Sequence, residues 1–376
     1  MVIRAPRRLM LVGGGHAQIH VLQALARAPL PGVAITLVDP GAYAIYTGMI
    51  PGMLAGLYAP EEARIDLGAL AAACGAELVQ DRVVRIRPDE RAVDLARGGS
   101  LPYDVLALDV GAQPSGTASV RGFAHVVPIK PIADAAERIE QFVAAAARDA
   151  AAQAIVVGAG AGGVEVAFAL RRRLPGQHHR VCIVERGAEL LSGAPARLQA
   201  LVARLCARAR IDVRVGAGDV VPIDHGIALG DGTHVAAELV VWATGAEGLP
   251  LLERSGLRCD PQGFALVDDM LRCTERPEIF AAGDCSRLES APWVPRAGVY
   301  AVRQGPILAG NVAATLRERG ALAPFRPQRR FLKLLSTADR RAVVSYGALA
   351  LHGRAGWWLK DAIDRRFIAR FTVPRA

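Results

Sequence analysis

Residues 154–166 read AIVVGAGAGGVEV, and this stretch decides the fold. An apolar β-branched run leads directly into Gly158, Gly160 and Gly163, and a helical pattern follows. Such a glycine turn is typical of a dinucleotide site: the first glycine makes the tight turn, the second admits a pyrophosphate, and the third lets the helix pack closely. The free N–H groups at the start of the helix then face the phosphates.

An acidic residue after the next apolar run strengthens this interpretation. Residues 180–184 read as a strand that ends at Glu185, where an acid accepts hydrogen bonds from ribose hydroxyls in such units. Glu185 favours NADH because a carboxylate repels a 2′-phosphate. Arg186 follows directly and could accommodate that phosphate, so NADPH stays open.

The same unit occurs a second time, near the N-terminus. It comprises the apolar run 9–12, Gly13, Gly15, a helical pattern over 17–26, the apolar run 33–38 and Asp39. Gly13 and Gly15 are the expected phosphate contacts, because Gln18 stands where the third small residue belongs. His16 could contact phosphate, although a lone histidine in a turn is more often structural. Two dinucleotide sites on one chain most often indicate a flavin and a nicotinamide.

Length and composition restrict the classes of protein. The 376 residues suffice for two or three domains, and 52% of them are hydrophobic. The net charge of +9 is compatible with an anionic partner, but we expect no nucleic acid because no recognition motif is present. The sequence shows neither a signal peptide nor an apolar run long enough to cross a bilayer, and its six cysteines lack regular spacing. We therefore expect a cytoplasmic protein, with peripheral contact to a membrane left open.

The loop at residues 42–58, AYAIYTGMIPGMLAGLY, is unusually apolar. It is either a loop packed on the core or the wall of a flavin pocket, with Thr47 close to the ring system. It holds no cysteine pair, which argues against a thiol–disulfide relay. Further along, residues 63–73 read as a helix and 78–86 as a strand, in which the backbone of Val83 would approach an adenine.

Five motifs resemble one family of two-dinucleotide flavoproteins, the pyridine nucleotide–disulfide oxidoreductases. They are VGGGHAQ at 12–18, LDVGA at 108–112, VVGAGAGGVE at 156–165, VVWATG at 240–245 and IFAAGDC at 279–285. Within the family, the chain is similar to the branch without redox cysteines, the type II NADH:quinone dehydrogenases. GGGHAQ, YTGMIPG and RAGVYAVRQGPILAGN are most similar to the flavoprotein domain associated with selenophosphate synthetase.

The resemblance implies two cofactors, FAD and NADH or NADPH. It places Asp284 on the flavin ribityl chain and directs the start of the helix over 296–310, including Ala297, at the flavin pyrimidine oxygens. The strands that end at Gly111 and Gly245 occupy corresponding places in the two units. No metal site is predicted.

Three residues are catalytic candidates. Glu165 either lies beside the nicotinamide, which the resemblance favours, or complements the helix dipole. Lys130 could donate to the flavin, although a solvated lysine between domains is slightly favoured. Gln304, one turn after Tyr300, would face the flavin from the acceptor side. Cys285 reads as a small core residue without a redox role.

The C-terminal segment, residues 326–376, is the least conventional part of the sequence. It suggests strands at 331–335 and 342–346, followed by a helix over 356–371. Leu359, Ile363, Phe367 and Phe371 form one apolar ridge of that helix, interrupted by Lys360 and Asp364. A helix lying on an anionic membrane, a cap over the flavin and a homodimer contact all stay open.

We therefore predict an α/β protein with two Rossmann-like dinucleotide-binding domains and a small C-terminal β/α cap. The FAD domain comprises 1–120 and 246–325, the NAD(P)H domain 121–245, and the cap 326–376. The expected reaction is hydride transfer from NADH to FAD, with electrons passed to a quinone-like acceptor without redox cysteines. The alternatives are a soluble NAD(P)H oxidase or flavin reductase linked to selenium or sulfur metabolism, and a non-enzymatic NADH-sensing flavoprotein.

Overall fold

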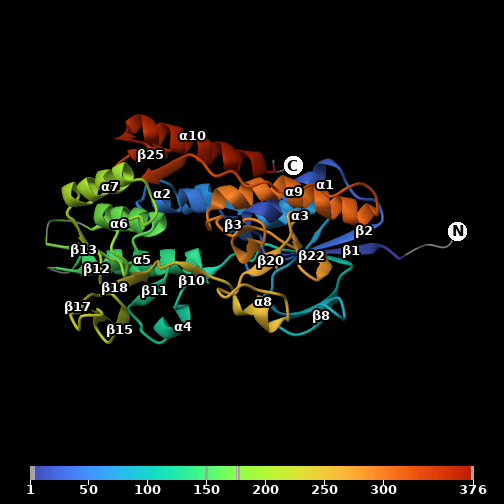
Figure 1. The fold of residues 1–376 in the computed structure, drawn as a ribbon, viewed down its shortest axis with the longest axis horizontal. Coiled ribbons are helices and arrows are strands. Elements are labelled where there is room, and N and C mark those ends of the chain that lie inside the picture. Colours follow the sequence, from blue (N-terminus) through green and yellow to red (C-terminus); the bar gives the residue numbers. More distant parts are fainter. Residues whose placement is uncertain (1–4, 149–150, 175, 177, 374–376) are drawn as a thin grey trace.

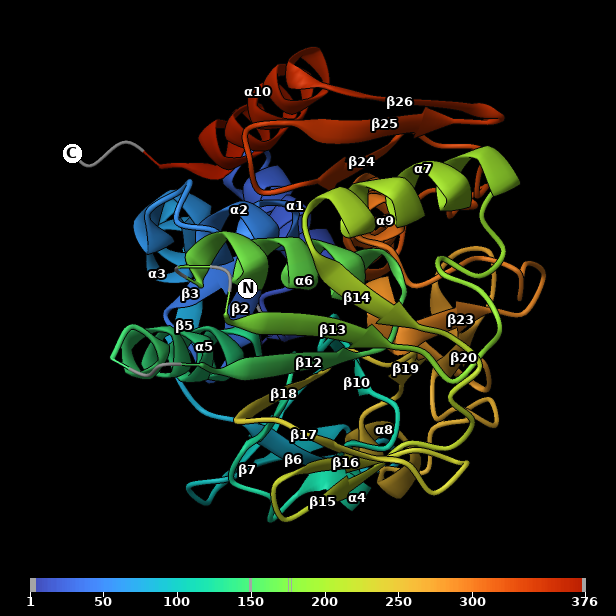
Figure 2. The ribbon, with the colours of Figure 1, turned by 90° about the vertical axis from the view of Figure 1, so that its left-hand side faces the viewer.

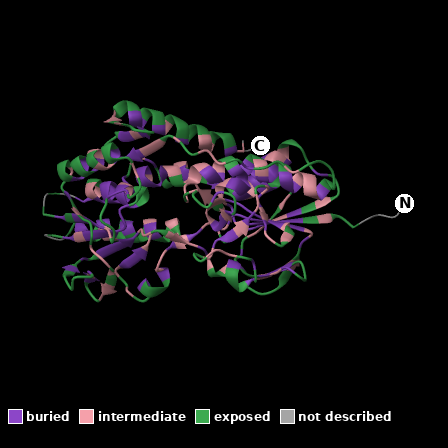
Figure 3. Ribbon diagram, in the orientation of Figure 1, coloured by how far each residue is buried: buried purple, intermediate pink, exposed green. Residues whose placement is uncertain are grey.

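The chain forms two large sheets side by side, one mixed and one parallel, and helices cover each of them (Figure 1). The computed structural model describes residues 5–148, 151–174, 176 and 178–373. Figure 3 shows that the strands of both sheets are buried, whereas the outer surface of the C-terminal helix is exposed. These layers are the predicted α/β architecture, which is thereby confirmed.

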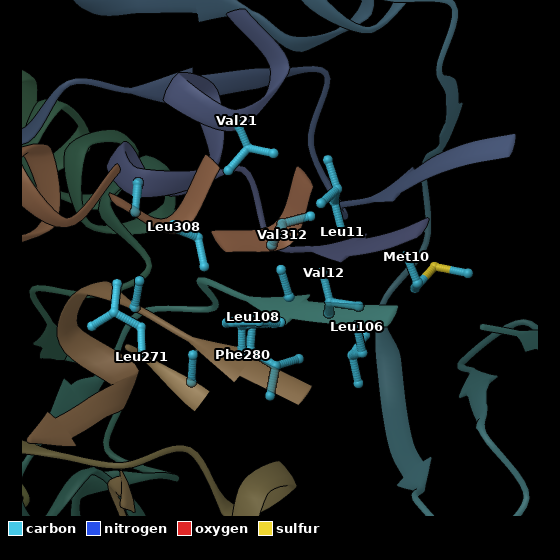
Figure 4. Packing of buried hydrophobic residues seen from close by; sticks show 14 of the residues in the cluster. Met10, Leu11, Val12, Val21, Leu106, Leu108, Leu271, Phe280, Leu308 and Val312 are labelled. Atoms are coloured by element: carbon cyan, nitrogen blue, oxygen red, sulfur yellow. The ribbon is translucent and has the colours of Figure 1, made fainter. Parts of the chain in front are cut away.

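The first sheet combines strands from both ends of the chain. Its central strands are parallel, and β22 from the last third of the sequence lies beside β9 from the first third. Helices α1 and α9 pack against each other over this sheet, and Figure 4 shows Val21, Leu308 and Val312 on the core. In sheet order, the strands are β23 (Ser286–Leu288), β20 (Ala265–Val267), β21 (Arg272–Cys273), β22 (Arg276–Ala281), β9 (Val105–Leu108), β1 (Arg7–Val12), β2 (Val33–Val38) and β5 (Glu77–Val79), and the helices are α1 (His16–Arg27), α3 (Leu67–Ala73) and α9 (Gly298–Arg317).

The second sheet is built from the middle of the chain, and its neighbouring strands all run parallel. Its buried strands are rich in Val and Ile, as expected for a sheet covered on both faces. In sheet order, it contains β11 (Val126–Pro128), β18 (Leu239–Trp242), β12 (Gln153–Val157), β13 (Arg180–Val184) and β14 (Ile211–Arg214), and its helices are α5 (Ile132–Ala146), α6 (Ala161–Arg173) and α7 (Ala196–Arg208).

Two short strands, β10 (Gln113–Pro114) and β19 (Ala246–Glu247), pair where the chain passes between the sheets. They lie close to the predicted domain boundaries at 120 and 245, which stay a prediction. The remaining small elements are β3 (Tyr43–Ile45), β4 (Arg64–Asp66), β6 (Val83–Arg87), β7 (Ala92–Leu95), β8 (Ser100–Pro102), β15 (Val221–Ile223), β16 (Gly226–Ala228), β17 (His234–Ala236), α2 (Ile50–Leu54), α4 (Thr117–Val120), α8 (Pro250–Arg254) and the 3₁₀ turns Thr47–Met49, Pro60–Ala63 and Gly283–Cys285.

The C-terminal segment lies over α6 and α7 (Figure 2). It consists of the antiparallel strands β24 (Lys333–Ser336), β25 (Ala342–Tyr346) and β26 (Leu349–Gly353), followed by α10 (Arg354–Phe371). The ring of Phe367 stacks on Tyr46 with centroids 4.2 Å apart, and Trp357 stacks on Tyr58 at 5.6 Å. The inner face of α10 therefore covers the apolar 42–58 loop.

Several predicted elements are wrong in detail. The helix expected over 63–73 begins at Leu67, because the side chain of Asp66 accepts a hydrogen bond from the backbone N–H of Ala69 and so caps it. The strand expected over 78–86 is two strands, separated where Asp81 accepts from the backbone N–H of Arg82 and of Arg97. Strand β26 was not expected.

Candidate functional site

The two glycine turns have the same backbone form. Gly13 has φ of 89° and Gly158 has φ of 111°, values that strongly favour glycine. A Cβ on Gly13 would lie 2.4 Å from the carbonyl oxygen of Asp109, and one on Gly158 would lie 2.3 Å from that of Ala243. Each turn is thus pressed against the residue that follows the neighbouring strand, β9 or β18.

The two acids also occupy matching places. Asp39 accepts hydrogen bonds from the backbone N–H of Gly14 and of Gly41, both at 2.7 Å. Glu185 accepts from the backbone N–H of Ala159 at 2.7 Å and from that of Gly187 at 2.9 Å. Each carboxylate therefore stabilises the glycine turn of its own unit. The contact of either carboxylate with a ribose stays a prediction.

A cavity of about 680 Å³ lies between the two units, a size typical of cofactor and ligand sites. Twelve of the seventeen predicted site residues do not line this cavity, among them Glu165, Val83 and Gly111. The cavity is lined by residues from both units, including the predicted Lys130, Gly160, Gly163, Gly245 and Asp284, together with Thr244, Phe264, Trp293 and Arg296.

Two catalytic candidates meet at the Gly283–Cys285 turn. The ammonium of Lys130 lies 2.9 Å from a carboxylate oxygen of Asp284, so this lysine is ion-paired rather than simply solvated. The side-chain oxygen of the buried Gln304 accepts a hydrogen bond from the backbone N–H of Gly283 at 2.7 Å. Both side chains therefore fix the turn that carries Asp284.

Glu165 lies on the other side of α6, against the C-terminal segment. Its carboxylate accepts a hydrogen bond from the backbone N–H of Ser336 at 2.7 Å. Burial raises the pKa of Glu165 to about 7, against the opposing effect of Lys360. Lys360 is itself buried and pairs with Asp364 at 2.6 Å. The three side chains form a polar group between α6 and α10.

His16 and Asp109 lie at the start of α1. Burial lowers the pKa of His16 to about 4, so its imidazole is neutral at physiological pH, and its ring contacts those of Tyr46 and Phe367. Within the described residues, its Nε2 is buried without a hydrogen-bond partner. Asp109 accepts hydrogen bonds from the backbone of α1, and burial raises its pKa to about 7.

Arg296 precedes α9 and faces the cavity between the units. Its guanidinium lies 3.8 Å from the centroid of the Phe264 ring. Burial lowers its pKa, and its Nε and Nη2 are buried without a partner among the described residues. Buried donors normally have an acceptor, so this geometry fits a ligand that carries phosphate or carbonyl oxygens. A Cβ on Gly160 would meet nothing within 4 Å, which leaves room for a pyrophosphate as well.

The remaining predicted residues lie around the first unit. Thr47 approaches Gly298, where a Cβ would be 3.4 Å from its hydroxyl, so the 42–58 loop meets the start of α9. Ala297 is the N-cap residue of α9, and Gly111 has φ of 73° three residues after β9 ends. Val83 is the buried first residue of β6. Their cofactor contacts stay predictions.

Asp109 and Arg296 were missed as individual site residues, and so were Lys360 and Asp364. A signal for Asp109 was present, because aligning LDVGA at 108–112 with WATGA at 242–246 places a carboxylate opposite Ala243. Arg296 had no comparable signal, since only the fold shows that its guanidinium lacks a partner.

The six cysteines are all free, and burial raises the pKa of each. None of them lines the cavity between the units. Within the described residues, no group of three or more His, Cys, Asp or Glu side chains could hold a metal ion.

Comparisons with known proteins found relatives both in sequence and in fold. An NADH dehydrogenase-like protein of Mycobacterium tuberculosis is 32% identical over 237 residues, which is 59% of this chain and 58% of that relative's own length. A type II NADH:quinone oxidoreductase of the same organism is 25% identical, with 94% of this chain and 82% of that protein covered. The fold matches the NDH2 of Plasmodium falciparum in complex with NADH, with a TM-score of 0.79, 15% identity, and 98% of each chain covered. Residues 7–305 match the model of the pyridine nucleotide-disulphide oxidoreductases, and the chain belongs to that family.

Proposed function

We propose that this protein is an FAD-dependent NADH dehydrogenase that passes electrons to a quinone. The observation that carries the proposal is the cavity of about 680 Å³, whose walls come from both dinucleotide units. Hydride transfer needs a nicotinamide and a flavin in direct contact, and a shared cavity is where two bound cofactors can meet. When bound, FAD supplies hydride acceptance and onward electron transfer, while the protein supplies placement and electrostatics.

The residues of each unit have distinct tasks in this proposal. The turns at Gly13 and Gly158 direct helix N-termini at the two pyrophosphates. Lys130 pairs with Asp284 and orients it, so that this carboxylate can accept a hydrogen bond from the flavin ribityl chain. Arg296 offers buried N–H groups to an oxygen acceptor in the cavity.

Electron transfer without a thiol relay is part of the proposal. Its support is the position of the cysteines, which lie away from the cavity and whose raised pKa values keep them as thiols at neutral pH. A relative named type II NADH:quinone oxidoreductase supports a quinone as acceptor.

The test is anaerobic reduction of the FAD-loaded protein by NADH, followed by steady-state turnover with a soluble quinone. Bleaching of the flavin by NADH and turnover that requires quinone are expected. Turnover with oxygen alone would indicate an oxidase, and a long-lived reduced state that quinone does not reoxidise would indicate a sensor. Replacing all six cysteines by serine should preserve turnover in folded protein, and its loss would contradict the thiol-free route.

We further propose that the outer face of α10 contacts an anionic membrane. Seven of the large hydrophobic residues that are exposed belong to residues 326–376, including Trp358, Leu359 and Ile363, which are 63%, 43% and 41% exposed. The charged pair Lys360–Asp364 points inward instead, so the usual distribution of polar and apolar residues on a surface helix is reversed. Arg354 and Arg366 on the same helix are exposed and complement anionic lipids. None of the described helices is long and apolar enough to span a bilayer.

Vesicle flotation tests the membrane proposal. Leu359→Glu combined with Ile363→Glu should release the protein from vesicles that contain anionic lipid, because both side chains are exposed and neither supports the inner face of α10. Val221→Glu, at a residue 53% exposed on β15, is the matched control and should bind like the wild type. Unchanged flotation of the double variant would contradict membrane contact, and a change in molecular mass alone would point to a homodimer.

A further inference from the structure

A side-chain carboxylate of the protein itself already occupies the N-terminus of α1. Asp109, 4% exposed at the end of β9, accepts hydrogen bonds from the backbone N–H of Ala17 at 2.8 Å and of Gln18 at 3.2 Å. The first N–H groups of a helix have no partner within the helix and are the groups that bind a phosphate. The Asp109 carboxylate therefore uses part of the site that the FAD pyrophosphate requires.

The neighbouring glycines show how closely this carboxylate is enclosed. A Cβ on Gly15 would lie 2.2 Å from Cγ of Asp109, and one on Gly283 would lie 2.3 Å from Oδ1. Two glycines on different segments thus make room for one side chain. Among the described residues of the second unit, Ala243 takes the place of Asp109, and a Cβ on Gly160 would meet nothing within 4 Å.

The charges around Asp109 do not neutralise it. Asp284 and the Cys285 thiol face it from the Gly283–Cys285 turn, and Lys130 faces it from the segment after β11. Lys130 is paired with Asp284 at 2.9 Å. His16 on α1 is neutral at physiological pH because its pKa is about 4, and Gln304 on α9 is uncharged. Within the described residues, Asp109 is a buried carboxylate without an ion-pair partner, and burial raises its pKa to about 7.

We propose that Asp109 caps α1 in the flavin-free protein and takes up one proton when FAD binds, so that FAD affinity depends on pH. A pyrophosphate and an ionised carboxylate repel each other at one helix terminus. Uptake of a proton from solvent removes the carboxylate charge, so the neutral side chain no longer competes with the pyrophosphate for the N–H groups of Ala17 and Gln18. This inference rests on FAD as the proposed cofactor of the first unit.

The experiment measures FAD binding to flavin-free protein between pH 6 and pH 9 by the change in flavin fluorescence. For the wild type, Kd should rise by up to about tenfold for each pH unit above 7, because one proton is linked to binding. Asp109→Asn should bind FAD with little pH dependence and more tightly than the wild type at pH 8.5.

The control is Asp104→Asn, a carboxylate at the other end of β9 that pairs with Arg8 at 3.1 Å. It should keep the wild-type dependence on pH. Calorimetry of the wild type in two buffers of different ionisation enthalpy measures proton uptake without any variant. About one proton per FAD at pH 8 is expected. No uptake, or equal pH dependence in wild type and Asp109→Asn, would overturn the inference while FAD binding itself stands. Absence of FAD binding at every pH would overturn the inference together with the proposed function.

Discussion

The two dinucleotide units share one backbone plan but differ in what lies beneath the helix. The tight turns at Gly13 and Gly158 and the acids Asp39 and Glu185 correspond in conformation and hydrogen bonds. Beneath α6 the helix packs closely on the turn, because a Cβ on Gly163 would lie 2.0 Å from the carbonyl oxygen of Gly158.

Beneath α1 the corresponding positions are polar. Gln18 takes the place of Gly163, is fully buried, and donates a hydrogen bond to the carbonyl of Ala107 at 2.8 Å. Asp109 takes the place of Ala243. The comparison teaches that the glycine pattern specifies the turn, whereas the residues opposite the turn specify its electrostatics.

The largest expected effect comes from the feature that both units share. Gly158→Ala introduces a Cβ 2.3 Å from the carbonyl of Ala243 at φ of 111°, so we expect loss of measurable NADH binding with FAD content unchanged. Gly310→Ala, inside α9 with nothing within 4 Å of the new Cβ, should leave both cofactors bound. Equilibrium dialysis with NADH and the flavin-to-protein absorbance ratio measure the two outcomes. Normal NADH affinity in Gly158→Ala would mean that the second turn does not hold the nucleotide.

The second effect concerns the feature that separates the units. Asp109 has a folded-state pKa of about 7 against an ordinary value of 3.8, so between these values the folded protein holds a proton that the unfolded chain releases. The free energy of unfolding of flavin-free protein should therefore fall as pH rises from 4 to 7, by an amount on the order of 4 kcal/mol at most. Asp109→Asn should remove most of this fall. Urea unfolding at pH 5 and pH 8 measures the fall in the free energy of unfolding. An equal fall in the wild type and in Asp109→Asn would refute the assignment.

The third effect concerns the acid at the end of β13. Glu185→Arg should change the ratio of kcat/KM for NADH to that for NADPH by about tenfold or more in favour of NADPH, because in the proposed ribose site a cation then replaces the carboxylate at the 2′ position. Glu185→Gln keeps an acceptor for the N–H of Ala159 and controls for loss of the turn itself. An unchanged ratio in a folded variant would remove Glu185 from the ribose site.

The smallest expected effect concerns Glu165. Glu165 on α6 corresponds to His20 on α1, which is buried beside Phe371 with ring centroids 4.8 Å apart. The pKa of Glu165 is raised to about 7, so Glu165→Gln should remove one ionisation near neutral pH from the profile of quinone turnover and leave reduction by NADH unchanged. His20→Gln should keep that ionisation, since the pKa of His20 is lowered to about 4. A profile that Glu165→Gln does not alter would assign Glu165 a structural role.

Local sequence was enough for the fold class and for the two turns. The reason is that Gly13 and Gly158 perform a backbone task that few other residues can perform, so the pattern and the structure are tightly linked. The pairings of Lys130 with Asp284 and of Glu165 with Ser336 join residues more than 150 positions apart, and local patterns carry no information about them.

The orientation of α10 was harder for a different reason. In the sequence, Leu359, Ile363, Phe367 and Phe371 form one apolar ridge, for which contact with a membrane, with the flavin or with a second copy stayed open. The structure buries Phe371 and exposes Leu359 and Ile363, because Lys360 and Asp364 find polar partners against the 42–58 loop and α6. Hydrophobicity alone cannot predict whether an ion-paired charged residue or a leucine will occupy the buried face of a helix.

The adjacency of β9 and β22 has a consequence for the order in which the protein is made. The second sheet is complete once residue 242 has been synthesised, whereas the first sheet lacks β22 until residue 281 has been added. A growing chain on the ribosome can therefore assemble the second sheet first, and the first sheet must wait with β9 unpaired along one edge. Truncated chains that end before residue 276 should accordingly expose that edge and aggregate.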